Sequence, residues 1–408
     1  MSAAADSLAS AERLRLVSTS FLALFAIVGL VLYGLPLYYD FFVKELGWTR
    51  AAVTSGNMIG KVLVGPLFGF LAGTLIDRVG PRKPMMVGII VASIALVGLG
   101  SIHTLAMFYL FYAMNALGYV LAGPLPNQVL LSRNFKEGRG KAMGIAYVGI
   151  GIGFFFVPQI TKYLIGAFGW RTALMLLGGL VVLVAMPLVL VLREGEGPAA
   201  AAARAAAPKA PLREHLTHRN FYILALGSMA SIGAVGGAVQ HFKMMLTIDK
   251  GWTQAEALNI ISMIAAVSLI GRFGAGWLAD KIGPKRVMLM VYALVTAAML
   301  ILVSGAEGNS IYLYVLCFGL GLGGEYLIIP LMAAQMYGTA VLGRIMGIIL
   351  TADGMAEALF PWIVGKLHDS TGSYSAGFQV LAVVAALGAI AVALLPGKPL
   401  TATPAATT

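Results

Sequence analysis

The chain contains one cysteine, Cys317, and few charged side chains: Asp, Glu, Lys and Arg make up 11% of its 408 residues. A single cysteine excludes an intrachain disulfide and a cysteine-rich metal site. Soluble domains carry about 25% charged residues, so this low fraction argues against a water-soluble enzyme. The chain is instead 59% hydrophobic and holds 50 glycines, a combination typical of helices that pack closely in lipid. The composition predicts an integral membrane protein.

Apolar runs of about 20 residues, the length needed to cross a bilayer, fill most of the chain. We predict twelve spanning helices, near residues 15–40, 51–76, 84–103, 105–131, 141–166, 170–192, 219–246, 254–278, 285–304, 309–337, 343–366 and 374–396. The expected fold is an all-α membrane protein of two six-helix bundles, residues 1–193 and 218–396. Residues 194–217 are rich in alanine and proline, which favours a flexible cytoplasmic linker over a short surface helix. Residues 397–408 are expected to form a flexible tail.

Basic residues are unevenly distributed among the loops. If both termini are cytoplasmic, nineteen of the 28 Lys and Arg residues lie in cytoplasmic segments, six in external segments and three in or near spans. This bias follows the positive-inside rule and accounts for the net charge of +11 without a nucleic-acid partner. We therefore expect a multi-pass protein of the cell membrane with both termini in the cytoplasm. Short loops and the lack of an organelle signal favour a bacterial inner membrane.

Three patterns of the first half recur in the second half at a nearly constant separation. Residues 47–49 recur after 204 residues, residues 73–83 recur as 276–286, and residues 141–144 recur as 344–347, the last two after 203 residues. Two homologous bundles in parallel orientation are the architecture of a transporter that rocks around a central site.

The repeated loop at 73–83 has the pattern Gly-x-x-x-Asp-(Arg/Lys)-x-Gly-x-(Arg/Lys), which resembles the signature of the major facilitator superfamily. The resemblance implies the major facilitator fold and a conformational latch formed by Asp77, Arg78, Asp280 and Lys281. An aspartate can stabilise a neighbouring helix N-terminus, and the cations can hold the loop at the anionic membrane surface.

Arg272 lies inside a predicted span, eight residues before Asp280. At ~1.5 Å per residue it is roughly 12 Å deep, where an ionisable residue is costly and usually faces a cavity or a partner. Arginine keeps its charge, and its planar fork matches a carboxylate. We interpret Arg272 as the anchor of a substrate carboxylate; the alternative is a structural ion pair with the span 343–366.

Three acidic residues also lie within predicted spans. Asp353 and Glu357 are four residues apart and therefore share one helix face, and Glu325 lies in a glycine-rich run. Each is a candidate for proton coupling, because burial in lipid favours the neutral form of a carboxyl group. The alternative for each acid is structural pairing.

Polar residues on other spans can orient a small substrate. Asn115 and Tyr119 share one face of the fourth predicted span, and His241 lies at the end of the seventh. They can hydrogen-bond a carboxylate or a hydroxyl group, or they can make interhelical contacts instead. Lys61 is either a second pore cation or a side chain that extends to the membrane surface.

Within the superfamily, the chain most resembles the monocarboxylate transporters and the related oxalate–formate antiporters. The segment around Arg272 is similar to the substrate-arginine segment of that branch, residues 135–149 resemble its signature before and within the fifth helix, and residues 361–369 resemble the end of its eleventh helix. Two positions depart from the animal members: Ser268 replaces an aspartate and Leu37 replaces a lysine. The animal proton relay therefore cannot be transferred to this chain.

The resemblance implies a secondary transporter that moves a small monocarboxylate of the lactate or pyruvate type by alternating access, most simply with a symported proton. The residues expected to contact substrate are Arg272, Tyr119, His241, Asn115, Tyr326, Leu37 and Lys61. A single arginine suits a monoanion better than an oxalate dianion, although Lys61 keeps an oxalate–formate type of antiporter open.

The sequence contains no convincing metal or nucleophile constellation. We therefore expect no enzyme activity, no metal and no cofactor, and a monomer whose partners are a small carboxylate, a proton and the lipid bilayer. The alternative from another class is a non-transporting nutrient receptor, which would usually carry a long signalling tail or loop.

Overall fold

The computed structural model describes residues 2–192, 212–305 and 308–397, and all regular elements in this part are helices. The first half contains α1 (Ser2–Leu24), η1 (Phe25–Tyr33), η2 (Leu35–Tyr38), α2 (Tyr39–Leu46), α3 (Arg50–Met58), η3 (Ile59–Val64), α4 (Gly65–Val79), α5 (Arg82–Gly100), α6 (Leu105–Ala122), α7 (Pro124–Asn134) and α8 (Arg139–Leu190). The second half contains α10 (Leu212–Thr217), α11 (Arg219–Met244), η4 (Met245–Asp249), α12 (Gln254–Ile282), α13 (Pro284–Val303), α14 (Ser310–Tyr337), α15 (Leu342–Thr371) and α16 (Ser375–Leu394). The predicted linker lies outside the described residues up to 211 and forms α10 after that, and the predicted tail lies outside them after residue 397.

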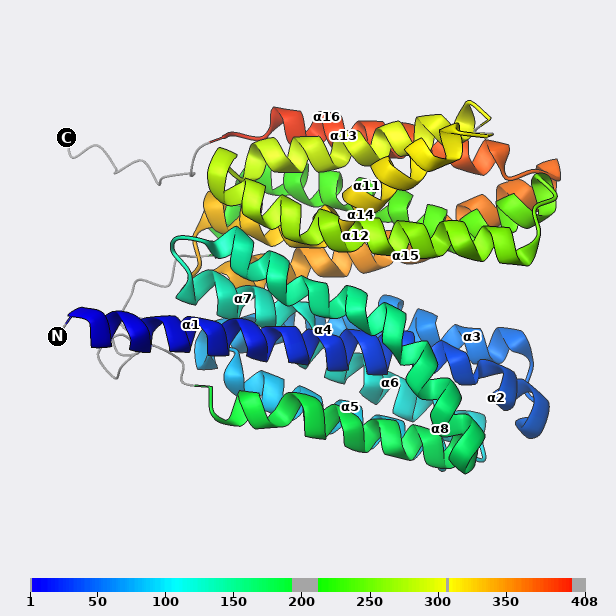
Figure 1. Cartoon of the computed structure of the whole chain (residues 1–408), viewed down its shortest axis with the longest axis horizontal. Helices are drawn as coiled ribbons and strands as arrows, with labels where there is room; N and C mark the ends of the chain where they lie inside the picture. The colour runs from blue at the N-terminus through cyan, green and yellow to red at the C-terminus, as the bar shows by residue number, and fades with distance from the viewer. Residues whose placement is uncertain (1, 193–211, 306–307, 398–408) are drawn as a thin grey trace.

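Ten helical stretches in the described residues are long and apolar enough to cross a membrane. The longest, α8, reverses direction at Gly169 (Figure 1), whose φ of 75° is unfavourable for residues with a Cβ atom, so α8 contains two of the predicted spans. The run of α3, η3 and α4 corresponds to the predicted span 51–76. Together these account for the twelve predicted spans and confirm the predicted all-α membrane fold.

A proline breaks the predicted span 105–131 into α6 and α7. Pro124 has no N–H group, so it cannot continue the hydrogen bonds of α6. Asn127 donates its side-chain amide to the carbonyl oxygens of Ala122 and Gly123, at 3.1 Å and 2.7 Å. The break is therefore stable within the membrane, where unsatisfied carbonyls are costly.

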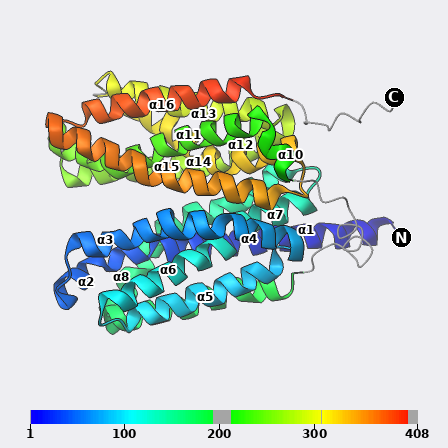
Figure 2. The same ribbon diagram turned by 180° about the vertical axis from the view of Figure 1, so that it is seen from behind.

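The two halves form two layers of helices, α1–α8 in one layer and α11–α16 in the other (Figures 1 and 2). The start of α1 and the end of α16 lie at the same end of the molecule, which we call the terminal end. The two layers converge toward this end in both views. Between the layers, α4 packs against α15 and α8 packs against α12, so the contact has the same two-fold repetition as the sequence.

Glycines allow these pairs of helices to touch backbone to backbone. A Cβ atom on Gly276 of α12 would collide with the carbonyl oxygen of Gly140 in α8, and a Cβ atom on Gly73 of α4 would collide with that of Gly343 in α15. Both contacts would be closer than 3.0 Å, a distance that real Cβ atoms essentially never show. Only glycine permits this approach, as in other close helix crossings in membranes.

The N-terminus of α8 is capped by a residue of the other half. The residue before α8 is Gly138, which has no side chain to accept a hydrogen bond. Asp280, near the end of α12, accepts hydrogen bonds from the N–H groups of Gly140 and Lys141, at 2.7 Å and 2.8 Å. A carboxylate at this position satisfies two free N–H groups and lies at the positive end of the helix dipole.

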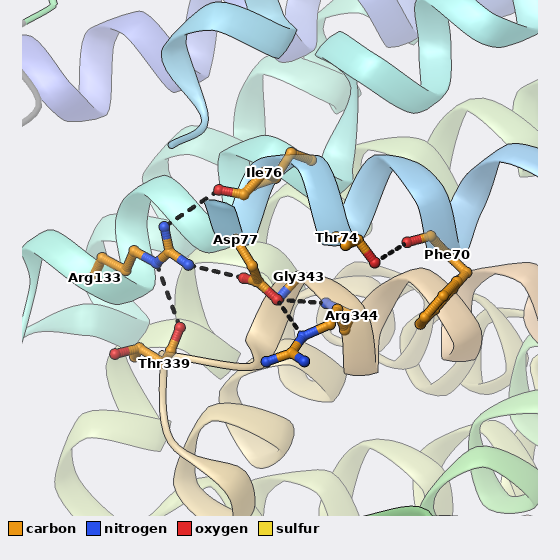
Figure 3. Close-up of polar contacts among 8 residues, drawn as sticks. All are labelled: Phe70, Thr74, Ile76, Asp77, Arg133, Thr339, Gly343 and Arg344. Carbon is orange, nitrogen blue, oxygen red and sulfur yellow. Dashed lines mark hydrogen bonds and ion pairs between the residues drawn. The ribbon is translucent and has the colours of Figure 1, made fainter. Parts of the chain in front are cut away.

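The N-terminus of α15 is capped in the same way by the first half (Figure 3). Asp77, near the end of α4, accepts hydrogen bonds from the N–H groups of Gly343 and Arg344, at 3.0 Å and 2.9 Å. The preceding residue, Val341, makes no side-chain cap. Arg133 also donates to Asp77 at 2.8 Å. Each half therefore caps one helix of the other half at the terminal end.

The basic residues expected in the latch lie elsewhere. Arg78 is exposed, and the ammonium group of Lys281 lies 3.9 Å from the centre of the Trp277 ring. Among the described residues, neither forms an ion pair with Asp77 or Asp280. Arg133 and Arg344 contact Asp77 instead, with Arg344 Nε at 3.4 Å.

We predict that Gly276→Ala opens the terminal end. The added Cβ atom must push α12 away from α8 by about an ångström to reach an ordinary contact of 3.4 Å or more. The measurement is the distance between spin labels at Lys136 and Arg286, two exposed positions on opposite halves, in a Cys317→Ser background. Gly274→Ala is the matched control, because a Cβ atom there meets open space. An unchanged distance in Gly276→Ala would show that the glycine contact does not hold the end closed.

We also predict that Asp77→Ala combined with Asp280→Ala separates the same labels. Loss of an N-cap costs about 0.5–2 kcal/mol, and one to two kcal/mol changes a population by roughly 5- to 30-fold. The control is Asp249→Ala, because Asp249 accepts from Tyr374 N at 2.7 Å within the second half alone. That variant should lower thermal stability without changing the label distance, and equal separation in both variants would contradict the prediction.

Candidate functional site

A cavity of about 140 Å³ lies between the two halves. On one side it is bordered by η1, η2, η3, α4, α6 and the start of α7, and on the other side by α14 and α15. Most of its lining is aliphatic or glycine. The polar or ionisable residues of the lining are Tyr112, Asn115, Tyr119, Tyr326, Thr351, Asp353 and Glu357.

Five residues singled out from the sequence line this cavity: Asn115, Tyr119, Tyr326, Asp353 and Glu357. Asn115 and Tyr119 are one turn apart on α6 and therefore face the same way. Asn115 is 5% exposed, and its side-chain NH₂ group has no hydrogen-bond partner among the described residues. A buried amide donor without a partner is costly, so Asn115 is suited to bind an acceptor group in the cavity.

Hydrogen bonds on α15 connect the cavity wall to its neighbours. Tyr326 of α14 donates to the carboxylate of Glu357. Thr351 donates to the carbonyl oxygen of Gly65, in the other half, at 3.0 Å. These hydrogen bonds connect α15 both to α14 in its own half and to α4 in the first half.

Arg272 lies on α12, outside this lining, and its side chain extends toward α8. Its Nη1 atom donates to Ser268 Oγ at 2.7 Å and lies 3.3 Å from the point where Gly151 would carry a Cβ atom. In the described part of the chain, no carboxylate lies within ion-pair distance of the guanidinium group. The structural ion pair with α15 is therefore absent there, and Arg272 has a charge with no opposite charge beside it.

Tyrosines interact with Arg272 and with residues of the cavity lining. The Tyr33 hydroxyl is within electrostatic range of both Arg272 and Glu357. Tyr119 in turn interacts with Glu357, Tyr33 and Tyr147. Tyr33 therefore interacts both with the guanidinium group and with Glu357 of the cavity lining.

Sequence reasoning missed Tyr33 and Tyr147 as site residues. Tyr147 is fully buried, accepts a hydrogen bond from Gln128 Nε2 at 2.7 Å and interacts with Arg272. One signal could have found it: Tyr147 lies one turn from both Gly144 and Gly151, on the glycine-rich face of α8 that contacts α12. Tyr33 carries no comparable signal, because aromatic residues are common near membrane interfaces.

Two acids lie beside or behind the cavity within the second half. Asp353 lines the cavity, and both of its carboxyl oxygens lie within hydrogen-bond distance of Ser228 Oγ, at 2.7 Å and 2.8 Å. Glu325 is fully buried and accepts a hydrogen bond from Ser231. Among the described residues no group of three or more His, Cys, Asp or Glu side chains could hold a metal ion.

Two other predicted residues, His241 and Leu37, are not brought to the cavity. His241 lies near the far end of α11, with Nε2 2.9 Å from the carbonyl oxygen of Pro361 and its ring beside Tyr374. Leu37 lies in η2 and is 39% exposed. Neither belongs to the cavity lining, and their contact with substrate stays a prediction. Lys61 lies in η3, and its side chain is outside the described part of the structure.

Comparisons with known proteins place the chain in a family. Residues 19–352 match the model of the Major Facilitator Superfamily. The chain is 27% identical over 380 residues to monocarboxylate transporter 13 of Bos taurus, covering 91% of this chain and 86% of that protein. It is 26% identical over 375 residues to monocarboxylate transporter 4 of Rattus norvegicus, covering 86% of this chain and 78% of that protein.

Solved structures share the fold. The proton:xylose symporter XylE superposes with a TM-score of 0.76 at 14% identity, covering 95% of this chain and 98% of that one. The human organic anion transporter MFSD10 superposes with a TM-score of 0.72 at 15% identity, covering 93% and 99%.

These similarities extend over most of the chain, and they agree with the duplicated loop, the twelve spans and the cavity between two halves. They also confirm the resemblance to the monocarboxylate transporters that the sequence motifs indicated, and they identify a multi-pass transporter rather than an enzyme. The chain therefore belongs to the major facilitator superfamily.

Proposed function

We propose that the protein moves a small monocarboxylate of the lactate or pyruvate type across the cell membrane by alternating access, with a co-transported proton. The transporting unit is the monomer, because both halves of the cavity belong to one chain. The relatives named above supply the substrate class, and the residues around the cavity supply the physical reasons.

The environment of Arg272 is the main observation that supports this proposal. A guanidinium group within a membrane span is costly, and in the described residues its hydrogen bond goes to Ser268 and not to a carboxylate. A substrate carboxylate would supply the missing opposite charge through two parallel hydrogen bonds. Tyr33 and Tyr147, which interact with Arg272, can donate to the same carboxylate.

The cavity has the size of a small substrate. Its volume is about 140 Å³, and an apolar cavity of about 150 Å³ is known to hold benzene. Lactate and pyruvate have as many heavy atoms as benzene. Asn115 would then donate its free amide hydrogens to the hydroxyl or keto oxygen, while Tyr119 orients the carboxylate toward Arg272.

The terminal end is assigned to the cytoplasm, as the distribution of basic residues predicts. The contacts of Asp77 and Asp280 then close the cytoplasmic side, and the structure corresponds to the state that accepts substrate from outside. Opening of these contacts, with closure of the opposite end, would release the substrate inward. The bacterial inner membrane stays the predicted location.

An anion antiporter of the oxalate–formate type is the second candidate. Lys61 favours it, because a second cation in the first half would balance a dianion. Against it, Glu357 lines the cavity, and its carboxylate would repel a second negative charge. Competition by oxalate distinguishes the two functions.

We predict that Arg272→Ala reduces uptake of labelled L-lactate into proteoliposomes by about 10- to 100-fold. Loss of a charged hydrogen-bonding partner costs roughly 1.5–3 kcal/mol, and each 1.4 kcal/mol is about tenfold in affinity. Arg272→Lys should recover only part of the activity, because lysine keeps the charge but loses the bidentate fork. Arg219→Ala, at an exposed position at the start of α11, is the control. Near-normal uptake by folded Arg272→Ala would exclude the anchor role.

We also predict that an inward proton gradient drives the accumulation of lactate inside proteoliposomes to a concentration above that outside. Uptake should rise as the external pH falls and should slow when the external side is made alkaline, because each cycle must bind a proton outside and release it inside. The measurement is lactate uptake with and without the gradient, in competition with pyruvate, formate and oxalate. Uptake that ignores pH, requires a preloaded anion and is blocked by oxalate would instead indicate the antiporter.

A further inference from the structure

A cluster of five hydroxyl and carboxyl side chains lies inside the second half, behind the cavity wall. It consists of Ser228 and Ser231 of α11, Tyr292 of α13, Glu325 of α14 and Asp353 of α15. All five are at most 2% exposed. Four different helices thus direct oxygen-bearing groups to one buried place, where each such group must find a partner.

The hydrogen atoms of this cluster are too few for two ionised carboxylates. Ser228 Oγ contacts both oxygens of Asp353, at 2.7 Å and 2.8 Å, yet a hydroxyl group has one hydrogen to donate. Ser231 donates to one oxygen of Glu325. The other oxygen of Glu325 has no hydrogen-bond partner among the described residues. A proton on each carboxyl group would supply the missing donors.

The charged groups around the cluster also indicate that both carboxyl groups are protonated. Glu325 interacts with Asp353 and Glu357, both acidic, and Tyr292 interacts with Glu325 and Asp353. Tyr326 adds a further interaction with Asp353. No basic side chain in the described residues interacts with either carboxyl group, since Arg272 extends from α12 toward α8. Two neighbouring carboxylates without a cation cannot both stay ionised in a dry interior, so protons neutralise them.

We infer that Glu325 and Asp353 form a proton-binding pair in the second half, with Ser228, Ser231 and Tyr292 as its hydrogen-bonding shell. Asp353 lies at the cavity wall and exchanges protons with the cavity, and Glu325 lies behind it as the inner acceptor. Each carboxylate gains one proton by forming an O–H bond, and no other bond changes. Glu357 interacts with both acids, but it accepts a hydrogen bond from Tyr326 and does not share the serine hydroxyls of α11.

The oxygen contacts favour protons over a metal cation. An oxygen-only set of ligands also suits a hard cation such as sodium. In this cluster, however, Ser228 already lies within hydrogen-bond distance of both carboxyl oxygens of Asp353, which leaves no space for an ion between them. Sodium is therefore the competing ligand that the experiment must exclude.

Proton binding at this pair would change the contact between α11 and α15. The contact of Ser228 with Asp353 joins the two helices, and that of Ser231 with Glu325 joins α11 to α14. Deprotonation leaves two like charges in this space and pushes these helices apart beside the cavity. That the protons bound here couple to substrate rests on the proposed symport; that the pair binds protons does not.

The first test needs no substrate. Infrared difference spectra of the purified protein in lipid nanodiscs, recorded across a pH titration, report protonated carboxyl groups through their C=O stretch. The expected result is a protonated-carboxyl signal in the wild type that decreases in both Glu325→Gln and Asp353→Asn and persists in Glu357→Gln. Ser231→Ala should shift the Glu325 signal without removing it, and this variant keeps the test decisive if Glu325→Gln does not fold.

Two results would overturn the inference. One is an unchanged carboxyl signal in both folded Glu325→Gln and Asp353→Asn. The other is a signal, or a melting temperature, that depends on sodium chloride but not on potassium chloride, because the cluster would then be a sodium site.

The second test concerns coupling. In proteoliposomes, Glu325→Gln and Asp353→Asn should lose proton-driven lactate accumulation but retain exchange of external for preloaded lactate. Unchanged accumulation in both variants would exclude the coupling role. Wild-type protein that does not transport lactate would instead contradict the proposed function, and the infrared result would still decide whether the pair binds protons.

Discussion

Two helix N-termini that cannot cap themselves are the constraint on which this structure depends. Gly138 and Val341 provide no capping side chain for α8 and α15, so Asp280 and Asp77 supply the cap from the opposite half. The caps exist only while the two halves are in contact, and glycine-to-glycine packing brings the backbones close enough to form them. Because each cap contributes only about 0.5–2 kcal/mol, the closed end is stable yet can open during a transport cycle.

The cost of burying charge in a membrane accounts for the arrangement of the ionisable residues in the site. Arg272 and the acids of α14 and α15 belong to the same half, but no ion pair joins them in the described residues. Tyr33 interacts with both Arg272 and Glu357. A direct pair would lower the cost of burying each group and would also remove the affinity of Arg272 for an anion. Their separation keeps the guanidinium group available for substrate and leaves the acids to bind protons.

The fold could be predicted from the sequence because both of its signals are local. Apolar length defines the spans, and the repeat at 203 residues defines the two halves. One helix boundary was less predictable: Pro124 divides a single apolar run, whereas the turn at Gly169 falls between the predicted spans 141–166 and 170–192. In the site, Asn115 and Tyr119 could be found from their one-turn spacing on α6. Tyr33 and the serines of α11 could not, because small or aromatic residues acquire their role only from the side chains that other helices place against them.

The repeat also shows how the two halves diverged. The capping contacts occur twice, but the ionisable residues of the site occur once. At the same separation of 203 residues, the counterparts of Arg272, Glu325 and Asp353 in the first half are Gly69, Ala122 and Ile150. Gly69 packs against α15, where Gly347 lies in close contact, so the position that carries the guanidinium group in one half serves helix packing in the other. Such a symmetric scaffold can open and close through equivalent contacts, while the guanidinium group proposed to pair with the anion and the acids proposed to bind protons all lie on helices of the second half.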